Sequence, residues 1–188
     1  MTLSAVQADI FLHHLEIQSK NPEKLSKFYA NVMGMKINRI SDQKFICDGP
    51  ERRIIITLGI NKTLSYAGMV CRNESNLYGF KDFLIKKELN LLEFKSDFYK
   101  SGSFSVKDPD GNLICFGVLE ENNKSQLKGI HAPLQHLTFA SKDVDAFQNF
   151  YANKLGFQLT DCVVNESGEL ATCFVTSNHQ HHTIACFK

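Results

Sequence analysis

The sequence predicts an α+β fold made of repeated βαβββ modules, in which paired modules form curved mixed sheets with helices on the outside. Three observations support this prediction: a gapless internal repeat, a strand-then-helix order in each copy, and a turn containing proline and glycine between the two strands that close a fainter third copy. With 188 residues, of which 43% are apolar and 22% charged, the chain is long enough to bury one sizeable core or two modest ones.

The internal repeat covers residues 14–35 and 136–157, which align without a gap at an offset of 122 residues. Nine of the 22 aligned positions are identical. These are His14/His136, Leu15/Leu137, Ser19/Ser141, Lys20/Lys142, Phe28/Phe150, Tyr29/Tyr151, Ala30/Ala152, Asn31/Asn153 and Gly34/Gly156. Such self-similarity between distant parts of one chain indicates a duplicated structural unit.

The first copy predicts a strand, a helix and three further strands. The run "IFLHHLEIQ" is strand-like, Asn21 is placed to cap a helix, and Pro22 suits the first helical position. We expect the apolar residues of this helix to form one stripe facing a sheet; they are Leu25, Phe28, Tyr29, Val32 and Met33. The β-rich runs "MKINRI", "KFICDG" and "RRIIITLGI" follow.

The second copy repeats these signals. It opens on "LQHLTFA", Asp143 can cap its helix, and Gly156, like Gly34, is placed to end the helix in a left-handed conformation. The predicted buried stripe of this helix consists of Phe147, Phe150, Tyr151 and Leu155.

The fainter copy lies between the other two. It opens at "LSYAGMVCR" (64–72) and closes on two strands that flank the turn Asp108-Pro109-Asp110-Gly111. Its helix carries Leu77, Phe80, Phe83 and Leu84. The polar stretch "EENNKSQLKG" (120–129) predicts a linker to the next copy.

Composition excludes several classes of partner. The 21 lysines and arginines nearly balance the 20 aspartates and glutamates, so nothing favours nucleic acid or a membrane surface. The six cysteines form no C-x-x-C pair, the N-terminus lacks the features of a signal peptide, and no apolar run is long enough to span a membrane. These features predict reduced thiols and a cytoplasmic location.

The module pattern, with an "H-L" strand leading to "FY-x-x-x-x-G" and a "DPDGN" hairpin, resembles the vicinal oxygen chelate (glyoxalase/bleomycin-resistance/dioxygenase) superfamily. The C-terminal segments "LQHLTFASKDVDAFQNFYANKLGFQLTD" and "FVTSNHQHHTIACF" are most similar to type I extradiol dioxygenases of the 2,3-dihydroxybiphenyl 1,2-dioxygenase kind. Those enzymes have two domains of two modules each. The resemblance therefore implies an N-terminal domain over 1–121, a linker over 122–129 and an incomplete catalytic domain over 130–188.

The resemblance also assigns roles to two histidines. It implies that His136 ligates Fe(II), with Mn(II) as the alternative ion, and that His182 is an acid–base residue over the substrate. A further histidine and a glutamate ligand would come from a fourth module. The first two modules open 52 residues apart, at 14 and 66, so a fourth would open near residue 188. We therefore expect a shortened form in which metal binding is weak or absent.

The resemblance implies an aromatic diol and O₂ as substrates. An open sheet edge predicts a homo-oligomer. Two alternatives remain: a metal-free protein that binds a small ligand, as resistance proteins do, and a glyoxalase-like metal-dependent enzyme. His136 and His182 each have a purely structural interpretation as well. For His14 we expect a structural, metal-free role, because Tyr66 and Cys115 stand where a related metal site needs ligands.

Overall fold

The computed structural model describes residues 1–120, 131–134 and 136–188. The predicted linker over 122–129 lies outside the described residues. The chain divides into two compact units. One contains Met1–Leu12, Met69–Leu119 and the described residues from 136 to 188, and the other contains His13–Gly68, Glu120 and residues 131–134. No helix in the described part of the chain is both long and apolar enough to cross a membrane.

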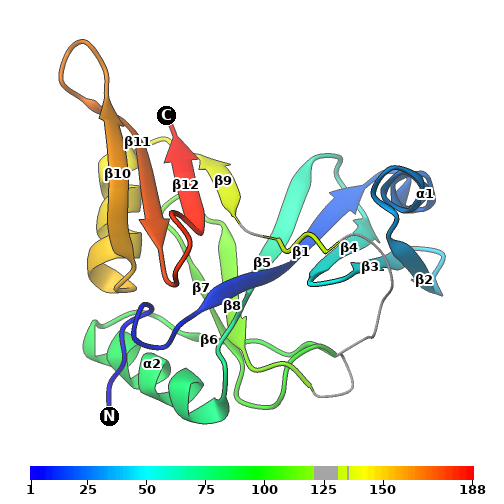
Figure 1. Cartoon of the computed structure of the whole chain (residues 1–188), viewed down its shortest axis with the longest axis horizontal. Helices are drawn as coiled ribbons and strands as arrows, with labels where there is room; N and C mark the ends of the chain where they lie inside the picture. Colours follow the sequence, from blue (N-terminus) through cyan, green and yellow to red (C-terminus); the bar gives the residue numbers. More distant parts are fainter. Residues whose placement is uncertain (121–130, 135) are drawn as a thin grey trace. The chain divides into compact units, whose positions relative to one another are not determined.

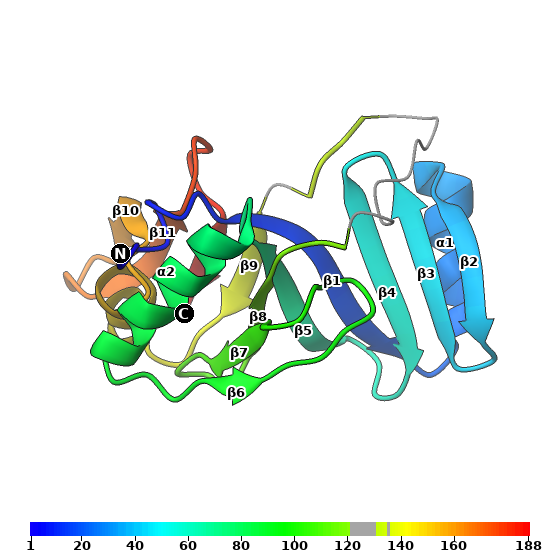
Figure 2. The same cartoon turned by 90° about the horizontal axis from the view of Figure 1, so that it is seen from below.

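The first module has the predicted βαβββ order. Its strands lie side by side in the order β2-β3-β4-β1, with β1 parallel to β4 and the other neighbours antiparallel (Figure 2). Its elements are β1 (Phe11–Ser19), α1 (Pro22–Met33), β2 (Lys36–Ser41), β3 (Lys44–Gly49) and β4 (Arg52–Leu58).

The second module repeats this order as β5-β8-β7-β6. Its elements are β5 (Thr63–Val70), α2 (Glu74–Lys86), β6 (Leu92–Glu93), β7 (Phe104–Lys107) and β8 (Leu113–Gly117). Of the four residues that the sequence places on this helix, Leu77, Phe80 and Leu84 are buried and Phe83 is half-buried. The ring of Phe80 contacts Phe116 on β8, with centroids 5.0 Å apart.

The third module forms a separate four-stranded sheet in the order β10-β11-β12-β9 (Figure 1). Strands β9 and β12 are parallel, while the other neighbours are antiparallel. Its elements are β9 (Leu137–Ala140), α3 (Val144–Gln148), the π-helical segment η2 (Asn149–Lys154), β10 (Gln158–Val164), β11 (Leu170–Thr176) and β12 (Ile184–Phe187).

The repeat extends to the register of the strands. Leu15 lies opposite Ile54 in the first module, and the equivalent Leu137 lies opposite Ile184 in the third. All three modules therefore place their first strand beside their last, and the paired modules and mixed sheets predicted from the sequence are confirmed.

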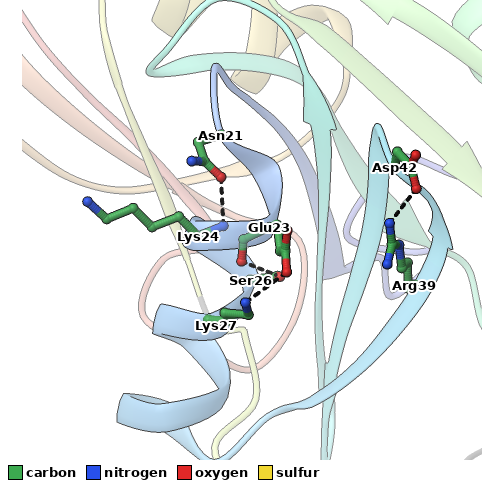
Figure 3. A network of polar contacts seen from close by, with 7 residues as sticks. All are labelled: Asn21, Glu23, Lys24, Ser26, Lys27, Arg39 and Asp42. Carbon is green, nitrogen blue, oxygen red and sulfur yellow. Dashed lines mark hydrogen bonds and ion pairs between the residues drawn. The ribbon is translucent and has the colours of Figure 1, made fainter.

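Helix α1 begins and ends where its capping residues predict. The side chain of Asn21 accepts a hydrogen bond from the backbone N–H of Lys24 (Figure 3). Gly34 ends the helix with a φ of 62°. The predicted apolar stripe is only partly buried. Leu25 and Tyr29 pack against the core of the sheet, whereas Phe28 and Val32 are 52% and 65% exposed, and the buried residues of the helix are Pro22 and Ser26.

The helix of the third module buries its whole predicted stripe. Phe147, Phe150, Tyr151 and Leu155 are all buried, and Gly156 has a φ of 71°. The sequence did not predict that the α-helix widens into a π-helical segment, where the N–H of Leu155 bonds the carbonyl of Phe150. The rings of Phe147 and Tyr151 lie 4.3 Å apart in this core.

The Asp108–Gly111 turn connects the second and third modules. Asp108 stabilises the turn by accepting hydrogen bonds from the backbone N–H groups of Asp110 and Asn112. It also accepts one from the buried hydroxyl of Tyr151, at 3.2 Å. Asp110 accepts a hydrogen bond from the Ser141 hydroxyl at 2.6 Å, directly after β9. The turn motif thus fixes the strand-to-helix connection of the next module.

Candidate functional site

The structure brings together the two histidines that the sequence analysis singled out. His136 lies immediately before β9, and His182 lies two residues before β12. Because β9 and β12 are paired in parallel, both residues reach the same end of the sheet. Their ring centroids are 4.5 Å apart and the rings are inclined by 45°. His136 is exposed and His182 is half-buried.

Aromatic and imidazole neighbours surround His182. Phe174 on β11 packs edge-to-face against it with centroids 5.2 Å apart, and the Nδ1 atoms of His181 and His182 are 2.9 Å apart. Burial, then the proximity of His136 and His181, lowers the pKa of His182 below its ordinary value. At neutral pH its imidazole is therefore uncharged and able to accept a proton.

The sequence analysis did not single out Phe174. It lies on β11, and only the strand register shows that it contacts His182. Its ring also lies 6.2 Å from Phe187, so it links the histidine to the exposed apolar end of β12.

His136 and His182 do not by themselves form a complete iron site. A mononuclear oxygenase iron takes two histidines and one carboxylate. Among the residues that the structure describes, no group of three histidine, cysteine, aspartate or glutamate side chains is placed to hold a metal ion. His136 and His182 contact each other, but among the described residues no third histidine, cysteine or carboxylate joins them in such a group. The residues present therefore do not fit a three-ligand iron centre.

In the first module, the residue equivalent to His136 has different surroundings. His14 is fully buried, lies edge-to-face against Tyr66 at 5.5 Å, and has its Nδ1 atom 3.0 Å from that of His13. Burial, aided by His13 and Arg53, lowers the pKa of His14 well below its ordinary value. Gly68 makes room for the ring, since a Cβ there would lie 2.3 Å from His14 Cε1. These contacts describe a packed, neutral imidazole.

Cys115, which stands where a related metalloenzyme has a glutamate, is fully buried on β8 opposite Ser105. A cavity of about 500 Å³ also lies in the second module, lined mainly by residues 91–96 and 99–104. It contains neither His136 nor His182.

Comparison with solved structures identifies the architecture. The 2,3-dioxygenase LapB from Pseudomonas sp. KL28 matches with a TM-score of 0.79 and 18% identity, over 100% of this chain and 72% of its own. The halotolerant catechol dioxygenase BphC matches with a TM-score of 0.75 and 18% identity, over 94% of this chain and 64% of its own.

A third match is homoprotocatechuate 2,3-dioxygenase from Brevibacterium fuscum in complex with 3,4-dihydroxyphenylacetate. It has a TM-score of 0.74 and 17% identity, over 95% of this chain and 60% of its own. The chain thus spans 60–72% of the length of these three structures, and at these identities the likeness establishes the fold alone. No curated protein sequence matches.

A family model matches most of the chain, over residues 11–116 and 134–187. These ranges contain all three βαβββ modules as well as His136 and His182. With the repeated strand order and the structural matches, this shows that the chain belongs to the Glyoxalase/Bleomycin resistance protein/Dioxygenase superfamily.

Proposed function

We propose that this chain forms part of an extradiol ring-cleavage dioxygenase that acts on catecholic substrates. The observation that supports it best is the contact between His136 and His182, two residues 46 positions apart whose rings lie 4.5 Å from each other. This pair belongs to a module whose fold is that of catechol-cleaving dioxygenases.

In this proposal His182 is the acid–base residue. Its lowered pKa leaves the imidazole neutral at physiological pH, so it can accept a proton from a catechol hydroxyl and later return it. Phe174 and His181 hold the ring, which fixes the direction in which the nitrogen points. His182 is partly exposed, so its imidazole can be reached from solvent.

His136 is the proposed ligand that this chain contributes to Fe(II), with Mn(II) as the alternative ion. A single imidazole binds such an ion weakly, because affinity depends on the complete preformed donor set. We therefore expect the 188-residue chain to bind iron weakly and to be inactive towards catechols. A polypeptide that supplies a further histidine and a carboxylate is expected to bind iron stoichiometrically and to cleave the ring.

Anaerobic Fe(II) titration, followed by an oxygen-dependent assay for the yellow ring-cleavage product, tests the proposal. His136→Ala should abolish iron binding in the longer polypeptide, whereas His182→Ala should retain iron and lower the cleavage rate by about 10²–10⁴-fold, as for loss of a general base. His131→Ala is a matched control, because His131 is an exposed histidine in the other unit. Stoichiometric iron and turnover in the 188-residue chain would show that the site is misplaced.

Binding of a small ligand without metal is the second candidate function. The cavity of about 500 Å³ favours it, since that volume suits a small molecule. Lys81 lines this cavity together with the aromatic rings of Tyr99 and Phe104, which suits an aromatic carboxylate. Lys95 and Lys100 line it too, but they are paired with Glu93 and Glu74. Calorimetric titration with benzoate, compared between the wild type and Lys81→Gln, distinguishes this function from the first.

We also infer a homo-oligomer in a reducing, cytoplasmic location. The six cysteines, which all lie within the described residues, form no disulfide with one another, and this supports a reducing location. Light scattering coupled to gel filtration tests the first inference, and localisation of a tagged chain tests the second.

A further inference from the structure

Three of the six cysteines form one row across the third module. Cys162 on β10 lies opposite Cys173 on β11, and Cys173 lies opposite Cys186 on β12. Residues that lie opposite one another on neighbouring strands point to the same face of the sheet. The Sγ atoms of Cys173 and Cys186 are 3.4 Å apart. Cys162 is exposed, whereas Cys173 and Cys186 are fully buried.

The cysteine row lies on the helix-covered face. Cys186 is opposite Phe139, and the ring of Phe139 contacts Phe147 of α3 at 6.3 Å. Phe174, which contacts His182, follows Cys173 directly on β11 and so points to the other face. The row is therefore separate from the proposed ring-cleavage site.

The backbone spacing suits a disulfide at either pair of neighbours. Opposite residues on antiparallel strands have Cα atoms about 4.5–5.5 Å apart, within the range of about 4.4–6.8 Å seen for disulfide-bonded cysteines. The central residue, Cys173, can therefore bond to the exposed or to the buried neighbour with little movement of the strands.

The fold does not require thiols in this row. In the first module the equivalent residues are Arg39, Phe45 and Ile56, which lie opposite one another in the same way. There the guanidinium of Arg39 lies over the ring of Phe45, 5.9 Å from its centroid. Ordinary packing residues thus fill the same positions of a sister module.

We propose that this row is an oxidation site, in which Cys162 reacts with a hydroperoxide and the oxidation ends as a buried disulfide between Cys173 and Cys186. In the first step the Cys162 thiol and the peroxide give a sulfenic acid and an alcohol, or water when the oxidant is H₂O₂. The Cys173 thiol then displaces water from the sulfenic acid and forms the Cys162–Cys173 disulfide. Finally, Cys186 attacks the sulfur of Cys173, and Cys162 leaves as a thiolate that takes up the proton lost by Cys186.

The overall change converts two thiols and one hydroperoxide into one disulfide, one alcohol and one water. Exposure sets the direction of this relay, because the oxidant and external reductants reach Cys162 first. Once the disulfide lies between the two buried sulfurs, dissolved thiols cannot reach it without opening of the sheet.

Timed oxidation of the reduced 188-residue chain with H₂O₂, stopped by alkylation and analysed by peptide mass spectrometry, tests the proposal. We expect a Cys173–Cys186 linked peptide, lighter by two hydrogen atoms than the reduced pair. Cys162→Ser should slow its formation by about tenfold or more, because the accessible thiol is lost. Cys186→Ala should instead accumulate the Cys162–Cys173 disulfide, because the last exchange cannot occur.

Two controls make the result specific. Val163→Ser changes the exposed residue next to Cys162 without removing a thiol, and should leave the rate unchanged. The buried thiols of Cys47 and Cys71 should remain available to alkylation after unfolding. Oxidation of Cys162 without any Cys173–Cys186 disulfide would overturn the proposal, as would an equal rate in Cys162→Ser.

Discussion

The paired histidines of the first module make its folding sensitive to acid. Burial, aided by the charge of Arg53, lowers the pKa of His13 from 6.5 to about 4, and the pKa of the adjacent His14 is also well below its ordinary value. As the pH falls through 6.5, the unfolded chain takes up these protons while the folded chain does not. The free energy of unfolding is therefore largest above pH 6.5 and decreases as the pH falls towards the folded-state pKa.

The size of the effect follows from the pKa of His13. A shift from 6.5 to about 4 corresponds to about 3 kcal/mol of unfolding free energy, lost in full once the pH is below the folded-state pKa. By about pH 5 the loss attributable to His13 alone is about 2 kcal/mol relative to about pH 8. His14 adds to this loss in the same direction, because its pKa is also lowered.

Chemical unfolding at about pH 8 and about pH 5 measures this difference. His13→Asn retains a polar group near the position of Nδ1 but cannot take up a proton, so its pH-dependent loss should be smaller than that of the wild type by about 2 kcal/mol. His131→Asn, which replaces a histidine whose side chain is 74% exposed, serves as the control and should behave as the wild type does. Equal pH dependence in His13→Asn and the wild type would refute the reasoning.

Three further substitutions test contacts described above. Gly68→Ala should lower the unfolding free energy by about 1–3 kcal/mol in a denaturant titration, because its Cβ would collide with the ring of His14; an unchanged midpoint would contradict this. Tyr151→Phe should lower the unfolding free energy by about 1–3 kcal/mol, since buried Asp108 loses a hydrogen-bond donor. An unchanged unfolding free energy would mean that water replaces the hydroxyl. Phe174→Ala should raise the pKa of His182 towards 6.5 in an NMR titration, because it removes part of the burial that lowers it. A pKa unchanged from the wild type would show that the two neighbouring imidazoles, rather than burial, determine it.

The sequence was sufficient to predict the module order and the helix ends, because these depend on local signals. Asn21, Gly34, Asp143 and Gly156 act at the helix ends as predicted. The orientation of α1 was not predictable in the same way. Apolar spacing predicts which residues share a face of the helix, but the buried residues of α1 are Pro22 and Ser26, and Phe28 is exposed.

The histidine pair and the cysteine row illustrate a second limit. His136 and His182 came from a family resemblance, while their 4.5 Å separation depends on the parallel pairing of β9 with β12. Cys162, Cys173 and Cys186 have no motif spacing at all. Their alignment follows from the strand register, which is set by turn lengths and by bulges in β10. A single sequence does not show which distant strands pair or in which register, so these alignments could not be predicted from it.

The turn at Asp108–Gly111 has a consequence for how the protein opens. The hydroxyls of Tyr151 and Ser141 in the third module donate hydrogen bonds to the carboxylates of Asp108 and Asp110. If the two modules separated, these hydroxyls and carboxylates would lose their hydrogen bonds to each other. The hairpin of β7 and β8 and the start of α3 therefore belong to one cooperative foldon. Their backbone amides should exchange with deuterium through a common opening event, so that loosening the turn exposes both modules to proteases together.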